Sequence, residues 1–360
     1  MINFQEFPSP NFDDLKGILR GEKEPERVHF VEFTVDPEMI IYILENYTEE
    51  SIPPLTRENR VEHMDKLIDF YSMLGYDSVN IGGLDCFRNL PEFRARILKD
   101  TADLSRGERT WVEEGGGIIK DWKDFEEIKW DDIKPDLNLI DKARKELPEG
   151  MKLTVWSSLF EVILERFFGY EDLFKFSVQK PNLVEAVFEK WGEKVYEWYK
   201  RAVEYSEVGA FFHADDLGYK NNTMLSPQFL RKNVFPWFKK YVDLAHENDL
   251  MYWYHCCGNA LSVMEDLIKD VNIDAFHSFQ DQIMPVSEFI NRYGDRVAAL
   301  GGIDVDKLAR MNTSELRKYV QKTLKDCMPG KYALGSGNSV TNYVPPENYI
   351  AMLEEALKWR

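Results

Sequence analysis

The most informative part of the chain is Met251-Tyr252-Trp253-Tyr254-His255-Cys256-Cys257-Gly258, an apolar run that predicts a strand ending in polar residues and a glycine. Side chains alternate between the two faces of a strand, so His255 and Cys257 would lie on one side and Cys256 on the other. A histidine and a cysteine on one side make half of a tetrahedral zinc site. The alternative is a packed histidine beside two buried thiols, since free cysteine is among the most buried residue types.

Short apolar or β-branched runs recur along the chain, with amphipathic stretches between most of them. The predicted strands are Val28–Phe33, Ser78–Ile81, Lys152–Trp156, Ala210–Phe212, Met251–His255, Ala275–Phe279, Val297–Leu300 and Tyr332–Leu334. The predicted helices include Arg57–Leu74, Leu183–Tyr205, Pro227–His246 (with Ser226 as its N-cap) and Pro346–Trp359. Eight strands alternating with helices predict an α/β fold, a (β/α)8 TIM barrel formed as one domain by residues 1–360. A doubly wound open sheet is the alternative.

The connection from about Asp85 to Pro135 is long and contains acidic runs. It predicts an insertion, either an elaborated loop or a small hairpin, packed over one face of the barrel beside an elaborated N-terminal region. Long loops are usually lids or binding elements, and a peripheral flap is the alternative.

The composition excludes several classes of protein. With 44% hydrophobic and 14% aromatic residues the chain can bury a large core and is not disordered. The formal net charge of −18 and the absence of a long basic cluster argue against nucleic-acid binding. No apolar run approaches the length that spans a membrane, and Met1–Glu6 lacks the features of a signal peptide. Four cysteines in 360 residues indicate reduced thiols rather than a disulfide framework, so a cytoplasmic protein is expected.

Polar residues follow several predicted strands and would converge at the carboxyl end of the barrel, where such enzymes place their active sites. They include Glu32, Asn80, Trp156, Asp215, Asp216, Gln280 and Asn338. One of the adjacent carboxylates Asp215 and Asp216 could act as acid or base, hold a hydroxyl, or orient a metal-bound histidine. Capping of the following turn is the alternative for both. No nucleotide-binding glycine motif, nucleophile elbow or H-E-x-x-H helix is present in the sequence.

Several motifs in order resemble the uroporphyrinogen decarboxylase-like superfamily. They are Asp215-Asp216-Leu217-Gly218, Leu225-Ser226-Pro227, His255-x-Cys257-Gly258, Tyr293-Gly294-Asp295-Arg296, Leu300-Gly301-Gly302-Ile303-Asp304 and Pro346-Glu347-Asn348. The ordered match covers roughly Phe70 to the C-terminus, and the resemblance implies a (β/α)8 barrel.

Two chemistries occur in that superfamily. True uroporphyrinogen decarboxylase is free of cofactors, and its N-terminal Arg-Gln-Ala-Gly-Arg type loop grips the carboxylates of its tetrapyrrole substrate. The early region here reads Val31-Glu32-Phe33-Thr34-Val35-Asp36 instead. An octacarboxylate needs several cations, so this chain looks poorly suited to porphyrinogen decarboxylation.

The chain looks closer to the methylcorrinoid-dependent methyltransferases, including those serving coenzyme M and O-demethylase systems. Those enzymes hold zinc by a His-x-Cys pair and a later cysteine, and use it to activate a thiol or similar methyl acceptor. His255 and Cys257 match the pair, Ser336 stands in the stretch of the later cysteine, and Gln280 stands where a carboxylate is often found. A carboxylate or a substrate atom could then serve as a further ligand.

The sequence therefore predicts a zinc-assisted methyltransferase that acts with a methylated corrinoid protein and a small-molecule acceptor. The candidate metal ligands are His255, Cys257 and Ser336, and the candidate catalytic residues are Asp215 and Asp216. The candidate substrate-binding residues are Glu32, Asn80, Trp156, Tyr254, Gln280 and Asn338, with the loop of Trp111 beside them. The alternatives are a metal-free decarboxylase or lyase that uses Asp215 or Asp216 as its acid, and a non-catalytic corrinoid or small-molecule carrier.

Overall fold

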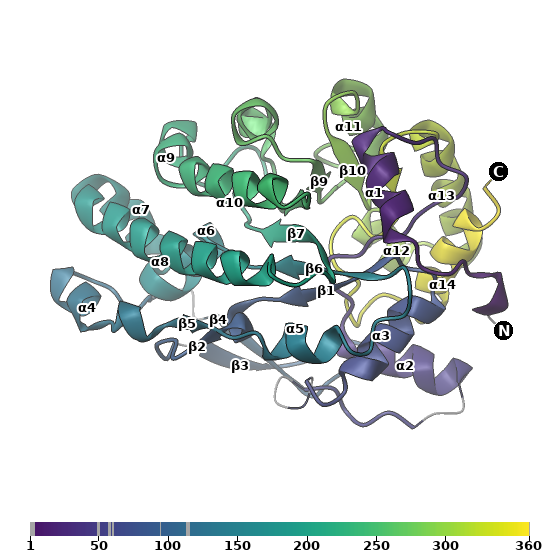
Figure 1. Ribbon diagram of the computed structural model, residues 1–360, viewed down its shortest axis with the longest axis horizontal. Helices are drawn as coiled ribbons and strands as arrows, with labels where there is room; N and C mark the ends of the chain where they lie inside the picture. Colours follow the sequence, from purple (N-terminus) through teal and green to yellow (C-terminus); the bar gives the residue numbers. More distant parts are fainter. Residues whose placement is uncertain are drawn as a thin grey trace.

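A curled parallel sheet of seven strands forms the centre of the computed structural model (Figure 1). Residues 4–48, 51–56, 59, 61–93, 95–112 and 116–359 are described, without the side chains of residues 110–112. The strands, in spatial order, are β1 (Ser78–Gly82), β6 (Lys152–Trp156), β7 (Val208–Ala214), β8 (Met251–His255), β9 (Ala275–His277), β10 (Ala298–Leu300) and β11 (Tyr332–Ala333). Each neighbouring pair is parallel, so their carboxyl ends meet at one edge. The expected α/β barrel is confirmed.

The first predicted strand, Val28–Phe33, is not a regular strand. A single parallel bridge joins Phe30 to Leu334, and the Val31 N–H donates to the Leu334 carbonyl at 2.9 Å. On the side that faces β1, a side chain supplies the hydrogen bond: the Asn80 amide donates to the Phe33 carbonyl at 2.9 Å. The segment thus occupies the position of a first barrel strand but has backbone pairing on one side only.

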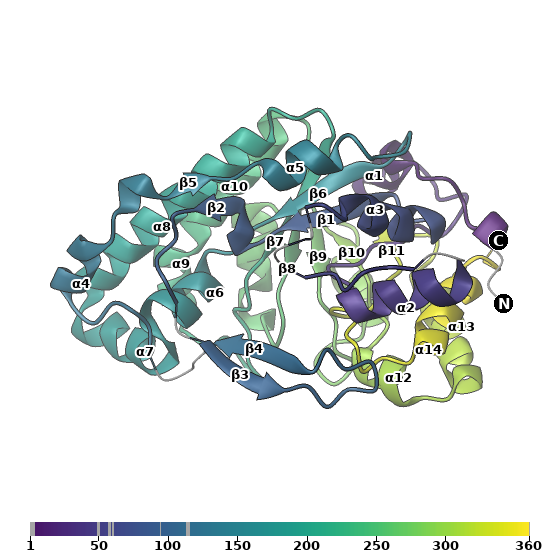
Figure 2. The same cartoon turned by 90° about the horizontal axis from the view of Figure 1, so that it is seen from below.

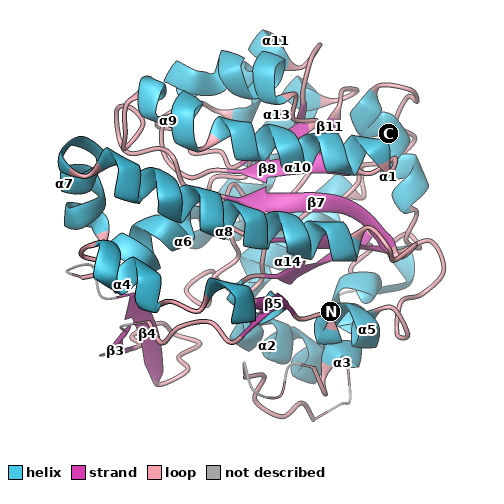
Figure 3. Cartoon of the chain, turned by 60° about the vertical axis from the view of Figure 1, so that its left-hand side comes forward, coloured by secondary structure: helices cyan, strands magenta, loops and turns pink. Residues whose placement is uncertain are grey.

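Helices cover the outer face of the sheet, and Figure 3 shows α8 and α10 side by side over β7 and β8. The longer helices are α1 (Phe12–Arg20), α2 (Pro37–Tyr47), α3 (Met64–Met73), α7 (Tyr170–Gln179), α8 (Pro181–Ala202), α10 (Phe235–Glu247), α11 (Val286–Tyr293), α13 (Thr313–Cys327) and α14 (Pro346–Ala356). The shorter ones are α4 (Trp122–Glu127), α5 (Asn138–Ala143), α6 (Phe160–Val162), α9 (Pro227–Asn233) and α12 (Val305–Arg310). Within the described residues, no helix is long and apolar enough to cross a membrane.

Two helix predictions need correction. The continuous helix Pro227–His246 is two helices, α9 and α10, because Pro236 lies in the first turn of α10 and cannot continue the hydrogen bonding of α9. The predicted N-cap is confirmed, because the Ser226 side chain accepts the Phe229 N–H at 3.2 Å. The helix predicted over Arg57–Leu74 begins only at Met64, and Arg57 itself lies outside the described residues.

The interior of the barrel is apolar at its amino-terminal end, where α1 inserts Phe12, Leu15 and Leu19. The ring of Phe12 packs against Trp253 of β8, with the ring centroids 5.9 Å apart. Small residues on the neighbouring strands make room for these rings; they are Ala210, Ala275, Ala298 and Ala333. This end is a packed core, which leaves the carboxyl end of the strands for polar side chains.

The long connection after β1 is an insertion with two small antiparallel sheets, as expected for a hairpin. One sheet pairs β2 (Phe87–Arg88) with β5 (Lys134–Pro135), and the other pairs β3 (Ala95–Lys99) with β4 (Glu108–Val112). Figure 2 shows the β3–β4 hairpin as an arm separate from the parallel sheet.

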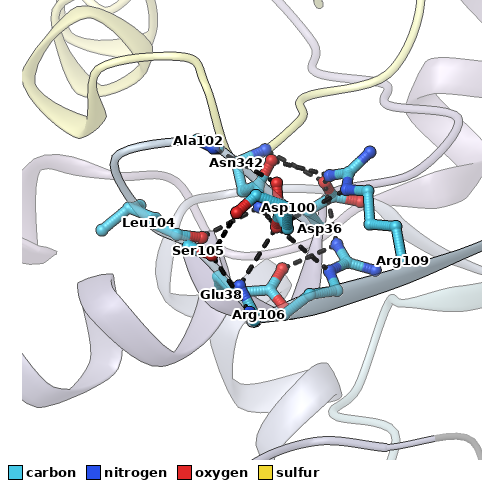
Figure 4. Close-up of polar contacts among 10 residues, drawn as sticks. Asp36, Glu38, Asp100, Ala102, Leu104, Ser105, Arg106, Arg109 and Asn342 are labelled. Carbon is cyan, nitrogen blue, oxygen red and sulfur yellow. Dashed lines mark hydrogen bonds and ion pairs between the residues drawn. The ribbon is translucent and has the colours of Figure 1, made fainter. Parts of the chain in front are cut away.

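The turn of this hairpin is bound to the loops that precede α2 and α14 (Figure 4). Asn342 donates to Asp100 at 2.7 Å, and Arg109 donates to Asp36 at 2.7 Å. The backbone N–H of Arg106 is the main contact that lowers the pKa of Asp100, to about 2. The hairpin is therefore fixed at its turn by charge-assisted hydrogen bonds between the insertion and the barrel.

Candidate functional site

Three metal-ligating side chains meet at the carboxyl ends of β7 and β8: Asp216, His255 and Cys257. Their candidate ligand atoms all lie within 4.8 Å of one another. His255 Nε2 lies 3.4 Å from Cys257 Sγ and 3.9 Å from Asp216 Oδ1. His255 is 5% exposed, so its ring has little contact with bulk solvent.

The period of two along β8 places this pair as expected. Met251 and Trp253 belong to the inner core of the barrel, and Tyr252 and Tyr254 to the outer core. His255 therefore continues the inner face, at the end where the apolar filling stops. Cys256 continues the outer face, where its sulfur accepts the Leu217 N–H at 3.3 Å.

Glycines allow the loops after β7 and β8 to touch. A Cβ on Gly258, whose φ is +73°, would lie 2.5 Å from the backbone of Gly218. The same packing brings the Cys257 N–H to Asp216 Oδ1 at 2.7 Å, which fixes the carboxylate beside the pair. A side chain at either position would collide with the opposite loop, which explains the glycines in the Asp-Asp-Leu-Gly and His-x-Cys-Gly motifs.

The three donors are costly to bury in charged form. Burial raises the pKa of the Cys257 thiol well above its ordinary value, and the nearby charge of Asp216 raises it further. Burial also raises the pKa of Asp216 and lowers that of His255 well below its ordinary value. Within the described residues, no lysine or arginine forms an ion pair with Asp216. A bound cation would compensate both acidic groups, since metal binding deprotonates its ligands.

The distances fit an ion of the size of zinc. Zinc bonds of about 2.3 Å to sulfur and about 2.0–2.2 Å to nitrogen and oxygen separate tetrahedral ligand atoms by roughly 3.5 Å. The two separations of 3.4 Å and 3.9 Å lie close to that value. One nitrogen, one sulfur and one oxygen donor leave a fourth position, the pattern of catalytic zinc sites.

Of the two adjacent carboxylates, only Asp216 belongs to this cluster. Asp215 is completely buried, and its oxygens accept four hydrogen bonds. The donors are the Ser158 hydroxyl at 2.5 Å, the Glu161 and Leu159 N–H groups at 2.8 Å and 2.9 Å, and His213 Nε2 at 2.9 Å. Asp215 therefore ties the end of β7 to the start of α6.

Ser336 lies beside the cluster but not in it. Its hydroxyl is 2.5 Å from Glu32 Oε2 and 3.1 Å from the Asn338 carbonyl, and its N–H donates to Glu32 Oε1 at 2.8 Å. The Ser336 hydroxyl has one proton for these two contacts, so it donates either to Glu32 or to the Asn338 carbonyl. Burial raises the pKa of Glu32 to about 8, despite the hydrogen bonds from Ser336. Asn338 also donates to Cys257 Sγ, at 3.0 Å.

Glu32→Gln is expected to stabilise the protein increasingly as the pH rises from about 5 to about 8. Between the ordinary pKa of 4.5 and the folded value of about 8, the unfolded chain loses this proton while the folded chain keeps it. The free energy of unfolding therefore falls with pH, by up to about 1.4 kcal/mol per pH unit for one group. Glutamine keeps the hydrogen bonds to Ser336 without this dependence. Thermal unfolding of both proteins across that range measures it, and a difference that does not change with pH would contradict the assignment.

The other predicted substrate-binding residues have different surroundings. Asn80 is held by Phe33 and by the Thr154 hydroxyl, and Trp156 packs edge-on against Phe33 with centroids 5.2 Å apart. Tyr254 lies on the outer face, where its hydroxyl donates to the Asp215 carbonyl at 2.7 Å. The side chain of Trp111 lies outside the described part of the chain.

Gln280 is exposed and lines a small cavity with Gly258 and Ser278. The cavity has a volume of about 20 Å³, which is enough for about one water molecule.

Sequence reasoning did not single out Asp216 from its neighbour as the third member of the cluster, nor His277 as a partner of His255. The parallel register of β8 and β9, which places His255 beside His277, was the available signal for the histidine. For the carboxylate the available signal was the alternation along β7, where Ala210, Phe212 and Ala214 face the inner core and Asp216 continues that series.

These features define a parallel α/β barrel with a partly buried cluster of three side chains that could hold a metal ion at the carboxyl ends of its strands. The model of the uroporphyrinogen decarboxylase (URO-D) family matches residues 119–359. The chain therefore belongs to the uroporphyrinogen decarboxylase family.

The fold is similar to that of two solved structures. A methyltransferase from Methanosarcina mazei has a TM-score of 0.67 at 16% identity, with 95% of this chain and 97% of that chain covered. A B12-independent methionine synthase from Shewanella sp. W3-18-1 has a TM-score of 0.51 at 11% identity, with 92% and 95% covered. No curated protein matches the chain in sequence. At these identities the likeness concerns the fold.

Proposed function

We propose that this protein is a zinc-dependent methyltransferase that moves a methyl group from a methylated corrinoid protein to a thiol or similar acceptor. The observation that carries the proposal is the cluster of Asp216, His255 and Cys257, with its nitrogen, sulfur and oxygen donors within 4.8 Å. Its position at the carboxyl end of the barrel strands is where such folds bind substrates. A further support is that the structure with which the chain shares its fold over nearly the whole length is a methyltransferase, from Methanosarcina mazei.

Zinc bound here would act as a Lewis acid that lowers the pKa of a thiol acceptor. The side chains of the cluster would contribute to this chemistry in different ways. His255 directs Nε2 toward the cluster, and ionised Cys257 and Asp216 carry two negative charges that balance the charge of the ion. Asn338 donates to the Cys257 sulfur at 3.0 Å, which stabilises a thiolate there.

The proposed transfer is a displacement at the methyl carbon. The acceptor sulfur loses its proton to solvent and forms a bond to the methyl carbon with its electron pair. The bond between the methyl group and its donor breaks, and that electron pair stays with the donor. The four free cysteines support a reducing compartment such as the cytoplasm, where an acceptor thiol also stays reduced.

Mixing the zinc-loaded protein with methylcobalamin and a panel of small thiols under anaerobic conditions tests this function. We expect a thioether, detected by mass spectrometry, and the matching change in cobalamin absorbance, both lost after chelation. Methylcobalamin serves as the donor because the corrinoid protein is unidentified. A protein that binds methylcobalamin in stoichiometric amounts without forming thioether would instead be a carrier.

A second candidate is a metal-free decarboxylase or lyase acting on a carboxylated substrate. Glu161 supports it, because burial and the charge of Asp216 raise the pKa of this carboxyl well above its ordinary value. A protonated acid near Asp216 could deliver a proton to a carbanion. Loss of carbon dioxide from a carboxylated substrate that persists after chelation and in Cys257→Ser would favour this candidate.

A further inference from the structure

His277 is the closest polar neighbour of the ring of His255 among the contacts of the described residues. The two residues lie side by side in the parallel register of β8 and β9. His255 Nδ1 lies 2.7 Å from His277 Nδ1, and His277 Nε2 lies 3.1 Å from the Ser336 carbonyl oxygen. Both rings are buried, with exposures of 5% and 0%.

These contacts determine where the ring protons lie. A carbonyl oxygen only accepts, so His277 Nε2 carries a proton and donates it to Ser336. Two nitrogens 2.7 Å apart share one proton, and neutral His277 then has a bare Nδ1 that accepts from His255. If His277 Nδ1 instead donated to His255, both ring nitrogens of His277 would carry protons and the ring would be a buried cation. No carboxylate contacts that ring among the described residues to balance the charge.

We propose that His277 is a positioning residue that holds the proton of His255 on Nδ1 and so keeps Nε2 bare toward Cys257 and Asp216. The inference rests on the proposed function, because a bare Nε2 is what a metal ligand requires. The opposite tautomer would direct an N–H at the cluster and could not bind a cation. His277 would then act through His255 without touching the metal.

A glycine gives independent support for this arrangement. Gly301 follows β10 with φ +80°, and a Cβ there would lie 2.2 Å from the Ser336 carbonyl oxygen and 2.9 Å from His277 Nε2. The loop after β10 therefore leaves no room for any side chain where the Ser336 carbonyl meets His277. On the other side Phe33 stacks on the His255 ring with ring centroids 4.3 Å apart, which restricts rotation of that ring.

Nitrogen NMR of metal-free protein labelled with ¹⁵N-histidine tests the proton positions directly. The chain has six histidines, so the two signals can be assigned from single substitutions. We expect His255 protonated at Nδ1 and His277 protonated at Nε2. A His255 signal protonated at Nε2 would overturn the proposal. Because no metal is present, this result is independent of whether the protein is a zinc enzyme.

Zinc affinity, measured by competition with a chelator, tests the consequence. His277→Phe keeps a ring of similar size but removes the acceptor, whereas His277→Asn places an amide oxygen near the position of Nδ1. We expect His277→Phe to bind zinc about 10–100-fold more weakly than the parent and His277→Asn to recover most of the loss. Unchanged affinity in a folded His277→Phe protein would overturn the proposal. If the parent binds no zinc, the proposed function fails, and the NMR result still decides the role of His277.

Discussion

Cys257→Ser is expected to remove nearly all zinc, leaving less than about one tenth of an ion per chain where the parent carries about one. A thiolate is the strongest of the three donors at this site, and a serine hydroxyl does not ionise near neutral pH. Only His255 and Asp216 would then remain as strong donors in the cluster. Methyl transfer should fall by at least about 10³-fold, because the activation of the acceptor is lost with the ion.

Cys256→Ser is the matched control for this experiment. Cys256 is adjacent in sequence and fully buried, but its sulfur lies on the outer face of β8 and accepts the Leu217 N–H. A serine oxygen can accept the same N–H, so zinc content should stay at the level of the parent. Metal analysis and circular dichroism on both variants separate loss of the ion from loss of the fold. Equal zinc in the two variants would contradict the ligand role of Cys257.

The period of two along β8 made half of the site predictable from sequence. It placed His255 and Cys257 on one side of the strand and Cys256 on the other. In the structure His255 Nε2 and Cys257 Sγ lie 3.4 Å apart, while Cys256 faces the outer core. The carboxyl-end position followed from the parallel barrel, because all seven strands of the sheet run in one direction. These inferences depend on local geometry that repeats along a strand, which explains their success.

The rest of the site depends on contacts between loops that are distant in sequence. Ser336 stands in the stretch where the family resemblance places a cysteine ligand, yet its hydroxyl lies against Glu32. Asp216 is held beside the pair by a contact between the loops after β7 and β8, which Gly218 and Gly258 make possible. Neither contact leaves a periodic pattern in the sequence.

The strands and helices, like the site residues, were predictable from sequence where they depend on local patterns. Seven predicted strands agree with the sheet to within a few residues at their ends, because each is a short apolar run between polar turns. The first predicted strand lacks a backbone ladder on one side, where the Asn80 side chain takes its place. The break between α9 and α10 was readable in advance, since Pro236 lacks the N–H that a continuous helix needs.

Asp215→Asn and Asp216→Asn should have opposite consequences, although the residues are adjacent and the substitution is the same. Asp215 accepts four hydrogen bonds while fully buried, and an amide would turn its NH₂ group toward the N–H of Leu159 or that of Glu161. A buried donor without an acceptor costs about 1–3 kcal/mol, and loss of the carboxylate charge weakens the remaining bonds. We expect Asp215→Asn to lower the free energy of unfolding by about 2–4 kcal/mol.

Asp216→Asn should leave the fold intact and weaken the metal site. Its amide oxygen can still accept the Cys257 N–H, which is the only hydrogen bond of Asp216 among those of the described residues with a distance below 3 Å. Burial raises the pKa of Asp216, so removing this charge costs the folded state little. Zinc should bind at least about 10-fold more weakly, because a neutral amide replaces an anionic ligand. Thermal unfolding together with zinc titration distinguishes the two variants. If Asp215→Asn lost zinc at unchanged stability while Asp216→Asn unfolded early, the two carboxylates would have been assigned the wrong way round.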